Sequence, residues 1–119
     1  MAELGATSDQ RFAKSDRVLT RGLFRQIYDE GHKFRAKYFI GFVKPNSREV
    51  SRIGITVTKR IGNSVLRNRS RRLVREVFRK NKWRVPPGVD IVINVKGGLA
   101  DAGFDELEKD FVEFLEKSK

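Results

Sequence analysis

Residues 64–80 read SVLRNRSRRLVREVFRK, and their apolar side chains recur at the spacing of an amphipathic helix. At about 100° per residue, an arc of about 140° collects six small or apolar side chains, which we expect to pack against a sheet. They are Leu66, Ser70, Leu73, Val74, Val77 and Phe78. The opposite arc carries four guanidinium groups, those of Arg71, Arg72, Arg75 and Arg79. Arg69 flanks the apolar arc, and we expect Arg67 to reach out from the start of the helix.

Strand-like alternation flanks this helix on both sides. Residues 50–58 place Ile53, Ile55 and Val57 on one face, and residues 89–95 place four aliphatic side chains on one face. The turn 86–88, Pro-Pro-Gly, separates the helix from the second of these strands. The sequence therefore predicts a strand, helix and strand in succession.

Three further elements are expected outside this unit. A short helix runs from about Thr20, a plausible N-cap, to Gly31, a plausible first residue beyond the helix. Residues 34–43 alternate like one strand, and a last helix covers about 104–116. The strand would place five side chains on one side, namely Phe34, Ala36, Tyr38, Ile40 and Phe42. This order of elements predicts an α+β fold, a two-layer sandwich of sheet and helices.

The length of 119 residues suits a single core, so we expect a flexible arm over residues 1–16 and one domain over residues 17–119. The chain has no cysteine and one histidine, His32, which excludes a disulfide scaffold, a thiol nucleophile and a multi-histidine metal site. The N-terminus has no apolar signal region, and the longest nearly apolar run, residues 38–43, is too short to span a bilayer. We therefore expect a cytoplasmic protein.

The positive charge is concentrated in one segment. The chain carries a net charge of +11, and residues 59–84 hold eleven basic residues and one acid, Glu76, so this segment alone accounts for +10. Residues 101–119 instead hold seven acids and three bases. A field of this kind attracts polyanions, and we expect the acidic last helix to turn away from them.

Several kinds of partner bind a surface of concentrated positive charge. A merely solvated helix face normally mixes charges of both signs, which favours nucleic acid here. A membrane-surface helix needs an exposed apolar stripe, and a DNA-reading helix needs a dimer surface, and neither is visible. A ribosomal or other structural RNA-binding protein would share the charge. The scattered acids Asp16, Asp29, Glu30 and Asp90, together with His32, form no self-contained nuclease site.

Residues 59–75, KRIGNSVLRNRSRRLVR, closely resemble the signature of the bacterial ribonuclease P protein subunit, with its Arg-Asn-Arg core. The resemblance extends to residues 23–31, to the strand at residues 39–42 and to residues 90–93, and so covers most of the chain from about 12 to 115. It implies a four-stranded sheet with three helices in the order α-β-β-β-α-β-α and a left-handed β-α-β crossover. That handedness runs against the usual rule for such units.

The resemblance also implies partners and roles. The subunit would bind a catalytic RNA, which removes the 5′ leader of precursor tRNA with Mg²⁺. The protein itself would hold no catalytic residue and no tightly bound cofactor, and it would be monomeric when free. The residues facing the catalytic RNA would be Lys59, Arg60, Arg67, Asn68, Arg69 and Arg72. A cleft for the single-stranded leader would be formed by Phe24, Tyr28, Ile40 and Phe42, edged by Arg71 and Arg75. The residues alone favour an ordinary core for Phe24 and Tyr28, although aromatic faces beside positive charge also suit a single strand.

Overall fold

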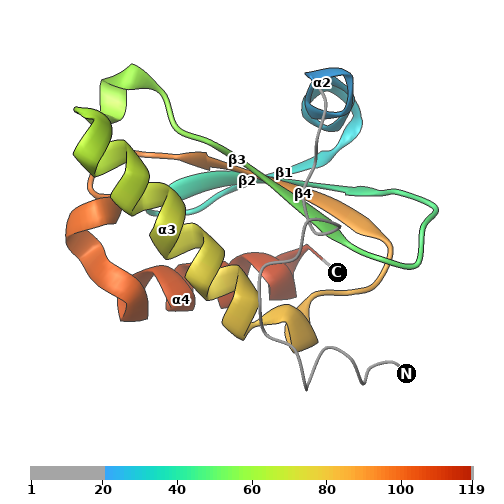
Figure 1. Ribbon diagram of the computed structural model, residues 1–119. Helices are drawn as coiled ribbons and strands as arrows, with labels where there is room; N and C mark the ends of the chain where they lie inside the picture. Colours follow the sequence, from blue (N-terminus) through green and yellow to red (C-terminus); the bar gives the residue numbers. More distant parts are fainter. Residues whose placement is uncertain (1–20, 119) are drawn as a thin grey trace.

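The computed structural model describes residues 21–118, in which helices pack on both faces of one sheet (Figure 1). The α-helices are α2 (Arg21–Glu30), α3 (Ser64–Lys80) and α4 (Leu99–Lys117). The strands are β1 (His32–Arg35), β2 (Phe39–Pro45), β3 (Arg52–Thr56) and β4 (Val89–Val95). Two short 3-10 helices, η2 (Lys59–Ile61) and η3 (Lys82–Arg84), flank α3.

The sheet has the order β1-β2-β4-β3. β1 with β2 and β2 with β4 pair antiparallel, whereas β3 and β4, which α3 connects, pair parallel. Alternate residues of β4 serve opposite faces: Ile91 and Ile93 join the core beneath α3 and α4, and Val92 packs beneath α2. The α+β class, the four-stranded sheet, the three helices and their order are confirmed, with α2 covering part of the face opposite α3 and α4.

The bounds of α3 match the predicted helix, because both of its ends are fixed by asparagine. The Asn63 side chain accepts a hydrogen bond from the backbone N–H of Leu66 at 3.0 Å, and Asn81 follows the last turn. Ser70, Val74, Val77 and Phe78 are buried, as the periodicity predicts. Ser70 can be buried because its hydroxyl donates to the Leu66 carbonyl at 2.9 Å, which satisfies the polar group.

The single strand expected over residues 34–43 is wrong, because this segment is a hairpin of β1 and β2. The Ala36 N–H donates to the Phe39 carbonyl at 2.9 Å, and Asp110 of α4 accepts from the Lys37 and Tyr38 N–H groups. The alternating residues before and after the turn lie on opposite faces of the sheet: Phe34 packs on Phe114 of α4, whereas Phe42 lies on the α2 face. A period of two that continues through a tight turn looks like one strand in the sequence.

The ends of the outer helices differ in detail from the predicted ones. Thr20 and the arm over residues 1–16 lie outside the described residues. Gly31 follows α2, as predicted, but its φ is not in the left-handed region. Glycine is required here for space, because a Cβ would collide with the Ile27 carbonyl oxygen. α4 begins at Leu99, five residues before the predicted start, and breaks at Gly103, whose φ is 83°. Within residues 21–118, no helix has the length and apolar character that a membrane span requires.

Candidate nucleic-acid interface

The segment before α3 forms a fixed elbow that presents two cations. Lys59 and Arg60 are exposed in η2, and Gly62 follows the last residue of this helix. Gly62 has a φ of 141°, and a Cβ at this position would lie 2.6 Å from Leu66 Cδ1. This backbone conformation favours glycine, and any other residue would also have to displace the Leu66 side chain. The elbow therefore sets the direction of Lys59 and Arg60 relative to the first turn of α3.

The Arg-Asn-Arg residues occupy the first two turns of α3. Asn68, Arg69 and Arg72 are exposed, so their polar groups are available to a partner. Arg67 is half-buried, and its Nη1 donates to the Gly62 carbonyl at 2.9 Å. Arg67 therefore reaches back across the mouth of the helix and braces the elbow, which still leaves its guanidinium further donors for a phosphate.

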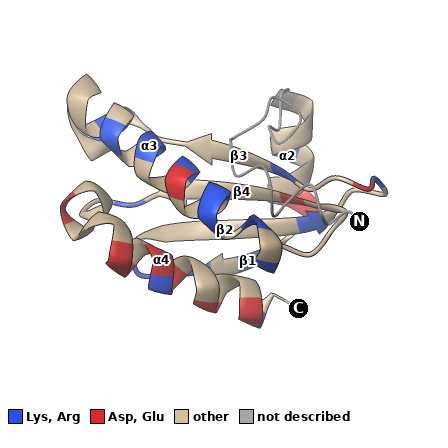
Figure 2. Cartoon of the chain, turned by 60° about the horizontal axis from the view of Figure 1, so that its bottom comes forward, with Lys and Arg blue, Asp and Glu red and all other residues tan. Residues whose placement is uncertain are grey.

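The remaining arginines of α3 have neighbours on their own helix. Arg71 is half-buried and donates to Asn68 Oδ1 at 3.4 Å, whereas Arg75 is exposed. Arg79 pairs with Glu76 at 2.7 Å, and this hydrogen bond lowers the pKa of the Glu76 carboxyl. Figure 2 shows cations along α3 beside an α4 that carries mostly acids. In the sequence of α3, Glu76 is the one acid. The net positive charge of α3 is therefore highest in its N-terminal half, away from Glu76.

The four apolar residues of the predicted cleft come together on the α2 face of the sheet. Phe24 and Tyr28 have ring centroids 6.3 Å apart, and Tyr28 meets Phe42 edge-on at 4.9 Å. Phe42 is only 8% exposed, but Phe24, Tyr28 and Ile40 are half-buried. Ile27 and Val92 lie at the bottom of this cluster. The α2 patch, meaning Phe24, Tyr28, Ile40 and Phe42, therefore combines a buried floor with partly open aromatic surfaces.

Two polar residues that the sequence interpretation did not single out connect this patch to β3 and β4. The Tyr28 hydroxyl donates to Asn94 Oδ1 at 2.8 Å and lies 3.0 Å from Thr56 Oγ1. These bonds hold the ring of Tyr28 at a fixed angle over the sheet. Strand alternation places Thr56 opposite Ile55 and Asn94 opposite Ile93, so the same signal could have indicated both residues.

The two cations expected to edge the patch lie on a different layer. Arg71 and Arg75 belong to α3, whose Val74, Val77 and Phe78 pack on the opposite face of the sheet from α2. A cation that does contact the patch is Lys33 of β1, whose Nζ lies 5.9 Å from the centre of the Phe42 ring. Across residues 21–118, no three His, Asp or Glu side chains are grouped as a metal site would need.

Fold and surface together define a class: a small basic α+β domain that presents a capped, arginine-rich helix and a separate aromatic patch. The family model for ribonuclease P matches residues 12–119. The chain belongs to the ribonuclease P protein family.

Named relatives agree with this assignment. The ribonuclease P protein component of Syntrophus aciditrophicus is 40% identical over 104 residues, covering 87% of each chain. That of Clostridioides difficile is 34% identical over 105 residues, covering 83% of this chain and 92% of its own. The solved RNase P protein of Thermotoga maritima superposes with a TM-score of 0.79 at 31% identity, covering 87% of this chain and 97% of that one. That of Staphylococcus aureus gives 0.79 at 28% identity, covering 89% and 97%.

Proposed function

We propose that this chain binds the catalytic RNA of ribonuclease P and the 5′ leader of precursor tRNA, and that the RNA performs the cleavage. The observation that carries the proposal is the N-terminal half of α3. There Asn68, Arg69 and Arg72 are exposed on a helix whose start is fixed by Asn63 and Gly62. Guanidinium groups on a rigid element suit phosphate, because each presents a planar fork of donors that stays charged.

The catalytic RNA would lie against η2 and the start of α3. Lys59 and Arg60 would contact its backbone together with Arg69 and Arg72, and Asn68 adds both a donor and an acceptor. Arg67 would hold the elbow by its bond to Gly62 and turn its remaining donors outward. The acidic α4 would face away from the RNA, which fixes the orientation of the domain on its partner.

The leader would lie on the α2 patch. A single strand gains affinity by stacking its bases on aromatic faces, at about 1–3 kcal/mol per base, with little dependence on sequence. Phe24 and Tyr28 have the half-buried rings that such stacking needs, and Lys33 supplies positive charge beside Phe42. Since leaders differ between tRNAs, contacts that tolerate any base suit this substrate.

The division of labour places Mg²⁺ with the RNA. The described residues offer no group of His, Asp and Glu side chains that could hold a metal ion, and we assign bond cleavage to the RNA. Its contribution is to hold the RNA and the leader and to lower repulsion between their phosphates. The requirement for Mg²⁺ should fall accordingly, since protein cations take over part of the neutralisation.

A cleavage assay tests this proposal. A bacterial ribonuclease P RNA is incubated with precursor tRNA at low Mg²⁺, with and without the chain. We expect the chain to accelerate removal of the leader and to cleave nothing by itself. Cleavage by an RNA-free preparation, or an RNA reaction that the chain leaves unchanged, would contradict the proposal.

A further inference from the structure

Strand β1 places two cations beside the α2 patch. Lys33 lies opposite Phe42 of β2, and Arg35 lies opposite Ile40. Directly opposed residues of an antiparallel pair point to the same face of a sheet, so both cations share the face of the patch. A single strand needs positive charge along its backbone as well as rings for its bases. The arginines of α3 lie on the other face of the sheet, so β1 is the closer source of that charge.

Contacts on both faces of β1 agree with this placement. Lys33 Nζ lies 5.9 Å from the centre of the Phe42 ring. Phe34, between the two cations, instead packs its ring on Phe114 of α4, at 5.7 Å between centroids. Lys33 and Arg35 are therefore neighbours on one side of the strand, about 7 Å apart at about 3.4 Å per residue. Successive phosphates of an extended single strand have a similar separation.

The charges of Lys33 and Arg35 are not neutralised by the described part of the chain. Both side chains are exposed, and neither forms an ion pair with another residue of 21–118. Glu30, the acid that ends α2, pairs with Lys44 of β2 instead, at 3.7 Å. Cations of this kind beside half-buried aromatic rings are the combination that binds single-stranded nucleic acid with little dependence on sequence.

We propose that Lys33 and Arg35, the β1 cations, hold successive phosphates of the leader while its bases stack on Phe24 and Tyr28. The inference rests on the proposed function in taking the leader as the ligand of the α2 patch, and it adds the path of the backbone. β1 and β3 are the two edges of the sheet, and η2 and α3 continue from β3. The leader and the catalytic RNA therefore use separate sets of cations, at edges that are three strand spacings of about 4.8 Å apart.

Charged side chains on an edge strand can also serve only to prevent pairing with another sheet. That role needs charge anywhere along the edge, whereas both β1 cations point to the face that carries the aromatic rings. If they only protect the edge, RNA binding will not depend on them. The two explanations therefore predict opposite results in a binding assay.

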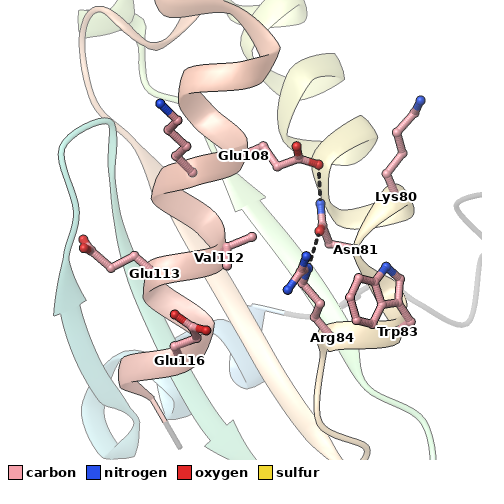
Figure 3. A pocket seen from close by; sticks show the side chains of 9 residues that line it. Lys80, Asn81, Trp83, Arg84, Glu108, Val112, Glu113 and Glu116 are labelled. Carbon is pink, nitrogen blue, oxygen red and sulfur yellow. Dashed lines mark hydrogen bonds between the residues drawn. The ribbon is translucent and has the colours of Figure 1, made fainter.

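The groove between α3, η3 and α4 is a less suitable surface for the leader (Figure 3). It contains an exposed tryptophan, Trp83, but three carboxylates and three cations line it, so phosphate meets repulsion as well as attraction. Residues 31–48, which include β1 and β2, instead hold five cations and no acid. Electrostatics therefore favour the β1 side of the sheet.

A leader without charge tests the proposal. Affinities are measured with ribonuclease P RNA present for mature tRNA, for precursor tRNA and for a precursor whose leader has uncharged methylphosphonate linkages. The neutral leader should weaken the complex of the unaltered chain. Lys33→Gln/Arg35→Gln should bind the ordinary precursor about tenfold more weakly, with no further loss for the neutral leader and no change for mature tRNA. Its salt slope for the precursor should be shallower by up to about 1.4, since each phosphate of a single strand contributes about −0.7.

Two control variants make the result specific. Lys109→Gln/Lys117→Gln removes the same charge from α4 and should bind all three RNAs like the unaltered chain. Phe24→Ala should lose affinity for the precursor without a change in salt slope, because stacking involves no charge. Precursor binding by Lys33→Gln/Arg35→Gln that equals the unaltered chain, or an equal loss for mature tRNA, would overturn the role of the β1 cations. In either case a loss of leader affinity in Phe24→Ala would leave the proposed function intact, so the two failures are distinguishable.

Discussion

The two faces of the sheet are built from different residues. The face beneath α3 and α4 is apolar throughout, and Phe39, Ile91, Ile93 and Phe114 are fully buried there. The opposite face is covered only in part, by α2, and it carries Thr56, Asn94 and the Arg52–Asp90 ion pair beside the apolar Val92.

Under the proposed function, we expect this difference to separate residues that stabilise the fold from residues that bind RNA. The α3–α4 face buries enough aromatic surface to hold the fold and to anchor the arginine helix. The α2 face is then free to keep half-buried rings and polar groups that a ligand can use. Substitutions on the first face should act on folding, whereas those on the second and on the outer side of α3 should act on RNA.

The largest effect is expected at the centre of the α3–α4 face. Phe114 is fully buried and touches the rings of Phe34, Phe39 and Phe111. Phe114→Ala should lower the free energy of unfolding by about 3–5 kcal/mol, measured by denaturant melts. Val65→Ala is the matched control, because Val65 lies in the neighbouring helix α3 and is 71% exposed. A loss below about 1 kcal/mol for Phe114→Ala would contradict the assignment of this face to stability.

The ion pair on the opposite face should come next. Arg52 donates two hydrogen bonds of 2.8 Å to Asp90, whose Oδ1 also accepts from Asn46. Asp90→Asn would leave the guanidinium without its counter-charge in a largely buried position, at a cost of about 3 kcal/mol. Thermal unfolding of this variant beside Asp101→Asn, an exposed acid of α4, measures the difference. Equal melting temperatures for the two variants would show that the pair stabilises nothing.

Substitutions on the outer side of α3 should change the affinity for RNA and leave the free energy of unfolding almost unchanged. If about five phosphates are neutralised, the logarithm of the affinity for ribonuclease P RNA should fall with the logarithm of salt at a slope of about −4. Arg67→Ala/Arg69→Ala should flatten this slope by up to about 2, while Lys109→Ala on α4 should not change it. A double variant with the original slope would mean that these arginines do not touch phosphate.

The smallest expected effect is on the pH dependence of stability, through Glu76 of α3. The hydrogen bond from Arg79 lowers the pKa of Glu76 below its ordinary value of 4.5, so the folded state prefers the ionised carboxylate. Glu76 therefore adds stability above the pKa of the unfolded chain and loses that contribution as the pH falls through its folded pKa. Glu76→Gln should be slightly less stable at pH 7 and equal to the unaltered chain at strongly acid pH. A difference that persists in acid would assign the effect to packing.

Much of this arrangement follows from local patterns in the sequence. The period of α3 identified its buried residues, and the alternation in β4 identified Ile91 and Ile93, because each pattern reports which side of one element meets a core. The hairpin turn at residues 36–38 is not recognisable in the sequence, because the strand-like alternation of side chains continues through it. The distance between α2 and the arginines of α3 could not be predicted, since the sequence does not state on which face of the sheet each helix packs.

The central claim is that the α2 face binds the leader and is not simply a second core, and Phe24→Ala tests it most directly. Its free energy of unfolding and its affinities for precursor and mature tRNA, each with ribonuclease P RNA present, should be measured on the same preparation. Replacing a fully buried phenylalanine by alanine lowers the free energy of unfolding by about 3–5 kcal/mol, and we expect a much smaller loss for Phe24→Ala. We also expect the ratio of its affinities for precursor and mature tRNA to fall toward one. A variant that nearly unfolds while its affinity ratio stays unchanged would contradict the claim and show that the α2 patch is core.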